Sequence, residues 1–121
     1  VTIVATGHLV WEAIKASEKL AENGINAEII NIHTIKPLDE DIILQSVSKT
    51  GCLVSAEEHN IYGGLGESIS RLLVTKLPSP QEFVGTKDTF GESGPPSELM
   101  NKYGLNSSSI YNSAVDVLKR K

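Results

Sequence analysis

The sequence predicts an α/β domain: a three-layer α/β/α sandwich with a mostly parallel, Rossmann-like sheet of four or five strands. Short β-rich runs alternate along the chain with segments that carry a helical hydrophobic period, and this alternation is typical of βαβ units. The chain has 121 residues, of which 40% are hydrophobic, and this suits one domain with one core. We therefore predict a single domain over residues 1–121.

Four segments have the composition of short strands. They are residues 2–6, 27–33, 52–56 and 82–84. The third segment is apolar enough to be central, and Cys52 at its start is expected to be a small core residue. Ligands of parallel sheets lie beyond the carboxyl ends of the strands. The loops at that edge are residues 7–9, 33–38, 57–64 and 87–95.

The spacing of apolar residues predicts the first two helices. The first should bury Val10, Ala13, Ile14, Ser17, Leu20 and Ala21. Its polar face should hold Glu12, Lys15, Glu18 and Glu22. Gly24 is the left-handed cap that ends this helix. Asp39 is the expected N-cap of the second helix, which should bury Ile42, Ile43 and Val47.

Three more helices are expected in the second half of the chain. One runs to about Lys76 and buries Leu65, Ile69, Leu72 and Leu73. A short helix has Pro96 near its start and Gly104 just past its end. The last helix begins at residues 107–109 and faces inward with Ile110, Ala114, Val117 and Leu118.

Composition and charge exclude several classes of protein. The chain has 15 acidic and 11 basic residues and a net charge of −4, which argues against nucleic-acid binding. No stretch approaches the roughly 18–20 apolar residues of a membrane span, and a signal-peptide pattern is absent. One cysteine forms no disulfide within the chain and suits the cytoplasm. Because Val1 opens a strand without an initiator Met, we expect one domain, the last, of a longer protein.

The glycines at positions 63, 64 and 66 follow a strand and open a helix, as in a dinucleotide fingerprint. Counted from Gly64, however, the position of the third fingerprint glycine holds the bulky Ile69. One interpretation is a phosphate cradle in a stand-alone nucleotide-binding module. The alternative is structural: the glycines permit a tight turn or a close approach by another subunit.

Glu57, Glu58 and His59 stand directly after the central strand. A carboxylate beside a histidine suits a general base or part of a metal site. No nucleophile stands nearby, and His8 and His33 lie on other loops without metal-ligand spacing. We therefore expect one carboxylate to be solvated and the other to cap a helix or pair at an interface.

Trp11 lies near the polar boundary of the first helix. A partly exposed tryptophan there suits a protein contact, and packing against the sheet edge is the alternative. The long loop over residues 90–96 suits either a contact or a connector. The residues therefore form no self-contained catalytic constellation, and this indicates a module that supports chemistry carried out elsewhere.

Motifs along the whole chain resemble the C-terminal domain of transketolases. The resemblance begins with VTIV at the N-terminus, Gly7 and Ala13, and continues with IKPLD at 35–39 and VSAEEH at 54–59. It extends through GGLGE at 63–67, FGESG at 90–94 and YGL at 103–105. The same domain type is found in 1-deoxyxylulose-5-phosphate synthase and in the beta chains of 2-oxo acid dehydrogenases, so these remain alternatives.

The resemblance implies an enzyme that uses thiamine diphosphate and a divalent cation, Mg²⁺ or Ca²⁺, to transfer a two-carbon ketol unit between sugar phosphates. It also implies that preceding domains, or an N-terminal subunit, hold the cofactor, the metal and the substrates. This domain would then support a homodimer of the whole enzyme and contribute no catalytic, cofactor or metal residue. The residues expected to face a neighbouring domain or subunit are Glu57, Glu58, His59, Tyr62, Gly63, Gly64 and Trp11.

Overall fold

The structure, a computed structural model, describes residues 1–33, 37–60, 64–86 and 104–121. Four parallel strands form one sheet, and their order is β2-β1-β3-β4. The strands are β1 (Thr2–Ala5), β2 (Glu28–Asn31), β3 (Leu53–Asn60) and β4 (Gln81–Thr86). The prediction of a parallel sheet is confirmed, and β1 and β3 occupy its centre.

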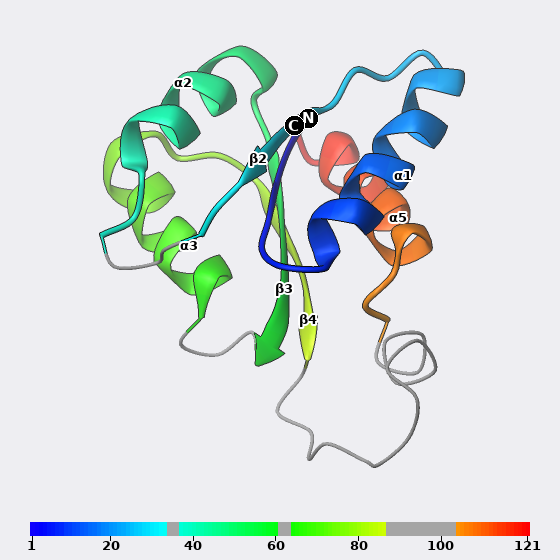
Figure 1. Ribbon diagram of the computed structural model, residues 1–121. Helices are drawn as coiled ribbons and strands as arrows, with labels where there is room; N and C mark the ends of the chain where they lie inside the picture. The colour runs from blue at the N-terminus through cyan, green and yellow to red at the C-terminus, as the bar shows by residue number, and fades with distance from the viewer. Residues whose placement is uncertain (34–36, 61–63, 87–103) are drawn as a thin grey trace.

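Helices cover both faces of this sheet (Figure 1). Helices α1 (Leu9–Glu22) and α5 (Ser107–Lys119) pack together on one face, and α2 (Glu40–Thr50) and α3 (Leu65–Lys76) cover the other. The three-layer sandwich is therefore confirmed. The short helix expected between Pro96 and Gly104 lies in residues 87–103, outside the described part. No helix in the described ranges is long and apolar enough to cross a membrane.

The hydrophobic core has two halves, one on each side of the sheet. Successive strand residues point to opposite faces, so Ile3 packs with α1 and α5 while Val4 packs with α2 and α3. Both side chains are fully buried. Cys52 is buried as expected, and burial raises the pKa of its thiol. It is a core residue, not a nucleophile.

Three residues that the pattern placed inside are on the surface: Ile14 and Ala21 on α1, and Ile42 on α2. Ile14 on α1 is 37% exposed and Ile42 on α2 is 43% exposed. In α2 the buried stripe consists of Ile43, Ser46 and Val47, so the helix is turned by about one residue from the predicted orientation. A serine is tolerated inside because Ser46 Oγ donates to Glu28 Oε1 at 2.7 Å and is bonded to Thr2 Oγ1 at 2.7 Å.

The ends of the helices follow local capping rules. Asp39 accepts a hydrogen bond from Ile42 N and caps α2, as predicted. Gly24, just after α1, has φ +76°, which confirms its role as the left-handed residue. At α5, Asn106 accepts from Ser109 N at 2.9 Å. These caps fix where each connection enters and leaves the sheet.

Candidate functional site

The carboxyl ends of β1 and β3 mark the point at which the chain reverses its direction across the sheet. From β1 the chain crosses to β2 on one side, and from β3 it crosses to β4 on the other. Ligand sites of open α/β sheets lie at such switch points. The candidate site therefore consists of the turn after β1, the end of β3 and the start of α3.

Two neighbouring carboxylates at the end of β3 reach different helices. Glu57 is 1% exposed, and its Oε1 and Oε2 accept hydrogen bonds from the N–H groups of Leu65 (2.9 Å) and Gly66 (2.8 Å). Glu58 is exposed, and its Oε1 accepts from the N–H of His8 at 2.8 Å. Because α1 and α3 lie on opposite faces of the sheet, each carboxylate occupies the positive N-terminus of a different helix.

An irregularity in the sheet accompanies this arrangement. Pairing between β3 and β4 is regular up to Ala56 opposite Val84 and resumes at Asn60 opposite Thr86. The chain of β3 therefore advances four positions while β4 advances two. Bulges of this kind re-aim side chains and are common near functional sites. Because pairing resumes at Asn60 beyond this bulge, residues 57–60, which were expected to be loop, belong to β3.

The glycine motif has a structural role in the described residues. Gly64 is the N-cap of α3. A Cβ on Gly66 would lie 2.5 Å from Phe83 Cδ2 and 2.8 Å from Ser55 Oγ, so this glycine permits close contact between α3 and the sheet. The N–H groups of Leu65 and Gly66, which a phosphate would need, already donate to Glu57. These contacts favour the structural interpretation over a phosphate cradle.

The structure brings some of the predicted site residues together. As expected, one carboxylate, that of Glu57, caps a helix, while Glu58 is exposed. Trp11 is 66% exposed and does not pack against the sheet edge. The backbone N–H of Trp11 donates to the carbonyl oxygen of His8 at 3.2 Å, and the backbone N–H of the same His8 donates to Glu58. The backbone of His59 lies in β3, whereas its side chain and residues Tyr62 and Gly63 are outside the described part.

Glu12 has a role that sequence reasoning missed, because its pattern placed it on the polar face of α1. Its Oε1 accepts from the N–H of Ser107 at 3.1 Å, so it holds the N-terminus of α5, while Lys15 bonds its Oε2 at 2.8 Å. Burial opposes ionisation, but the bonds from Lys15 and Ser107 prevail and lower the pKa of Glu12. No local pattern could indicate a partner 95 residues away.

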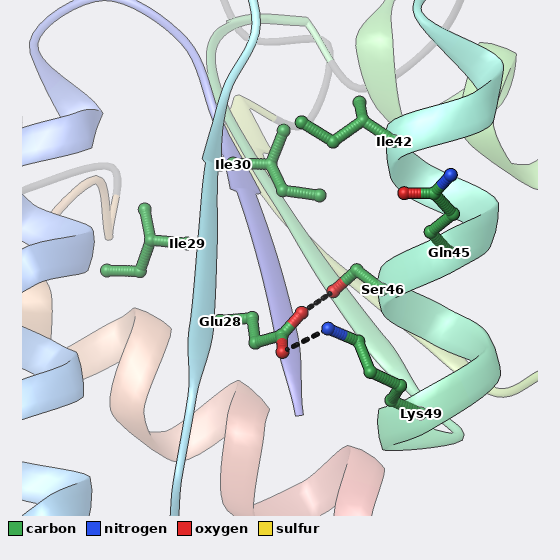
Figure 2. A pocket seen from close by; sticks show the side chains of 7 residues that line it. All are labelled: Glu28, Ile29, Ile30, Ile42, Gln45, Ser46 and Lys49. Atoms are coloured by element: carbon green, nitrogen blue, oxygen red, sulfur yellow. Dashed lines mark hydrogen bonds and ion pairs between the residues drawn. The ribbon is translucent and has the colours of Figure 1, made fainter.

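A hollow lies between β2 and α2, apart from the residues of the candidate site. It has a volume of about 380 Å³ and is bounded by β2 and α2. In Figure 2 Ile30 and Ile42 face each other at one end, and Glu28, Ser46 and Lys49 bond at the other. Because Lys49 Nζ and Glu28 Oε2 pair at 2.8 Å, the charges here neutralise each other and suit a structural contact.

The pair between Glu28 and Lys49 leads to a prediction on pH. Hydrogen bonds from Lys49 and Ser46 hold the pKa of Glu28 below its ordinary value of 4.5. A depressed carboxyl pKa contributes stability above the unfolded value, and this stability is lost as the pH falls through the folded pKa. We expect Glu28→Gln to flatten the decline in stability as the pH falls below about 5. Urea unfolding at several pH values measures this; an unchanged slope would contradict it.

Comparisons with known proteins cover most of this chain. The family model of the transketolase C-terminal domain matches residues 1–110. The chain is 46% identical over 121 residues to the 6-deoxy-6-sulfo-D-fructose transketolase subunit SqwH of Clostridium sp., covering all of this chain and 38% of that protein. It is 42% identical over 107 residues to a 1-deoxy-D-xylulose-5-phosphate synthase of Desulforudis audaxviator, covering 87% of this chain and 17% of the synthase.

A solved structure has the same fold. It is described as a split gene transketolase in an inactive beta4 tetramer, and the two chains superpose with a TM-score of 0.93 at 36% identity. The match covers 98% of this chain and 39% of the other. This chain therefore spans about two fifths, or less, of the length of the relatives it matches.

Proposed function

Because the chain belongs to the transketolase C-terminal domain family, we propose that it is the C-terminal part of a thiamine diphosphate-dependent transketolase and supports assembly of that enzyme. The remainder of the enzyme, as preceding domains or as an N-terminal subunit, holds the cofactor, a divalent cation and the sugar phosphates. The whole enzyme is a cytoplasmic homodimer of these units that transfers a two-carbon ketol unit.

The observation that carries this proposal is that the N–H groups at the two helix N-termini of the switch point are already hydrogen-bonded. A diphosphate needs free N–H groups at such a place, but in α1 and α3 the N–H groups of His8, Leu65 and Gly66 donate to the chain's own carboxylates. Residues 1–33, 37–60, 64–86 and 104–121 also hold no group of three metal-ligating side chains. The described residues therefore do not fit thiamine diphosphate or its cation, and no catalytic step is assigned to them.

What this edge does offer is a surface for another polypeptide. Trp11 is exposed beside the turn after β1, and exposed tryptophans are enriched among the residues that dominate protein interfaces. The relatives named as transketolase subunits or sections are longer than this chain, which supports a further domain or partner in the whole enzyme. Glu57, which was also expected to face a neighbour, is buried against the N-terminus of α3 and is left out of this surface. The residues proposed to face the partner are Glu58, His59, Tyr62, Gly63, Gly64 and Trp11.

The proposal is tested by reconstitution. We expect this chain alone to show no thiamine diphosphate binding by calorimetry and no ketol transfer. When it is mixed with the polypeptide that supplies the rest of the enzyme, we expect assembly and turnover. Trp11→Ala should raise the dissociation constant of assembly about tenfold through loss of an interface anchor, with kcat of the assembled enzyme unchanged. Sedimentation and a coupled ketol-transfer assay measure the two effects.

Val74→Ala is the matched control, because Val74 is 74% exposed on α3, in the opposite helical layer. It should leave assembly unchanged. Micromolar thiamine diphosphate binding by this chain alone would overturn the proposal that the remainder of the enzyme holds the cofactor. Equal dissociation constants of assembly for the Trp11→Ala variant and the unsubstituted chain would show that Trp11 is not part of the interface. If the reconstituted enzyme made 1-deoxyxylulose 5-phosphate, the synthase alternative favoured by the 42% identical relative would replace the transketolase.

A further inference from the structure

Glu58 is held in place by a backbone N–H and forms no ion pair with the residues that the structure describes. Its Oε1 accepts from the N–H of His8, and the position of a Cβ on Gly7 lies 3.5 Å from the same oxygen. Within the described ranges, the ion pairs use Glu12, Glu28, Glu40 and Glu82. Glu58 takes part in none of these pairs, and its Oε2 accepts no hydrogen bond from the same residues. Among the residues that the structure describes, one oxygen is therefore fixed and the other has no partner.

Trp11 presents an exposed aromatic side chain one helical turn after His8, whose N–H binds this carboxylate. It lies in the first turn of α1, where its backbone N–H donates to the carbonyl oxygen of His8. Side chains of a helix lean toward its N-terminus, which here is the turn that holds Glu58. The nearest cation along α1, Lys15, is bonded to Glu12. The carboxylate of Glu58 and the residue that carries the exposed indole thus flank the same turn at His8, and no Lys or Arg of the described residues pairs with that carboxylate.

We infer that Glu58 and Trp11 form a docking point for an arginine side chain of the polypeptide that completes the enzyme. A guanidinium group donates in plane to a carboxylate and stacks on an aromatic ring, whereas an ammonium group offers only a point charge. A phosphate or carboxylate would be repelled by Glu58 in a chain of net charge −4. This inference rests on the proposed function, because it specifies the chemistry of the proposed partner.

Trp11 is the only tryptophan of the chain, so labelling with 5-fluorotryptophan gives one ¹⁹F resonance at the docking point. The labelled chain is titrated with the polypeptide that supplies the rest of the enzyme. Glu58→Gln keeps Oε1 as acceptor for His8 N–H and removes only the charge. We expect its dissociation constant to rise at least tenfold, with an unchanged urea midpoint, and the salt dependence of binding to weaken. Glu22→Gln, an exposed carboxylate at the other end of α1, is the control and should bind like the unsubstituted chain.

The outcomes distinguish a failure of the proposed function from a failure of the arginine contact alone. If the unsubstituted chain neither binds nor shifts the ¹⁹F resonance, the proposed function fails and the arginine contact fails with it. If this chain binds but Glu58→Gln binds equally well, only the arginine contact is overturned. An affinity of the unsubstituted chain that does not fall with ionic strength overturns the ion pair independently of any variant.

Discussion

Replacement of Glu57 by alanine is expected to lower the free energy of unfolding by about 3–5 kcal/mol, one of the largest effects of any single substitution here. The carboxylate is 1% exposed and accepts hydrogen bonds from two backbone N–H groups of α3. Without it, the N–H groups of Leu65 and Gly66 stay buried and unpaired at the positive end of the helix. Urea unfolding followed by circular dichroism should show a midpoint lower by about 2 M.

Glu58→Ala is the matched control for this experiment, because Glu58 is the next residue and also occupies a helix N-terminus. Its carboxylate is exposed, so water replaces it at His8 N–H, and the loss should stay below about 1 kcal/mol. Glu57→Gln should fall between the two, since its amide oxygen serves one N–H while its NH₂ faces the other. Equal losses for Glu57→Ala and Glu58→Ala would show that burial does not distinguish the two sites.

The assignment of Glu57 and Glu58 illustrates what sequence reasoning could reach. The residues indicated that one carboxylate caps or pairs and the other is solvated, but did not indicate which. That choice depends on β3 continuing to Asn60, because the two-residue period of a strand then sends Glu57 toward α3 and Glu58 toward α1. Continuation to Asn60 is a property of the irregular pairing with β4, and no local pattern encodes it.

Other features likewise either follow from short-range sequence patterns or depend on the packed fold. The parallel sheet, the cap at Asp39 and the turn at Gly24 follow from short-range patterns, and the structure confirms them. The bond between Glu12 and Ser107 N–H joins helices far apart in the chain, so it requires the packed fold. The family followed from the order of several weak motifs, each of which alone is common.

Gly66→Ala is the second large effect that we expect, a loss of about 2–3 kcal/mol of stability. The added methyl group would meet Phe83 Cδ2 at 2.5 Å, Phe83 Cε2 at 2.7 Å and Ser55 Oγ at 2.8 Å. The ring of Phe83 is partly exposed and yields a little, but Ser55 is fully buried on β3. Alanine favours the helix by up to about 1 kcal/mol, which does not offset the displacement of α3 from the sheet. Thermal and urea unfolding measure the difference.

Gly24→Ala separates this contact from the general cost of replacing a glycine. At Gly24 nothing lies within 4 Å of an added Cβ, and only the φ of +76° opposes a side chain. Its cost should therefore be about 1 kcal/mol, from backbone strain alone. The displacement of α3 in Gly66→Ala also moves the N–H groups that bind Glu57, so Gly66→Ala combined with Glu57→Ala should cost less than the sum of the two. If the losses of stability in Gly66→Ala and Glu57→Ala simply added, helix α3 and the carboxylate would not be held as one unit. A smaller loss of stability in Gly66→Ala than in Gly24→Ala would contradict the close contact of α3 with the sheet.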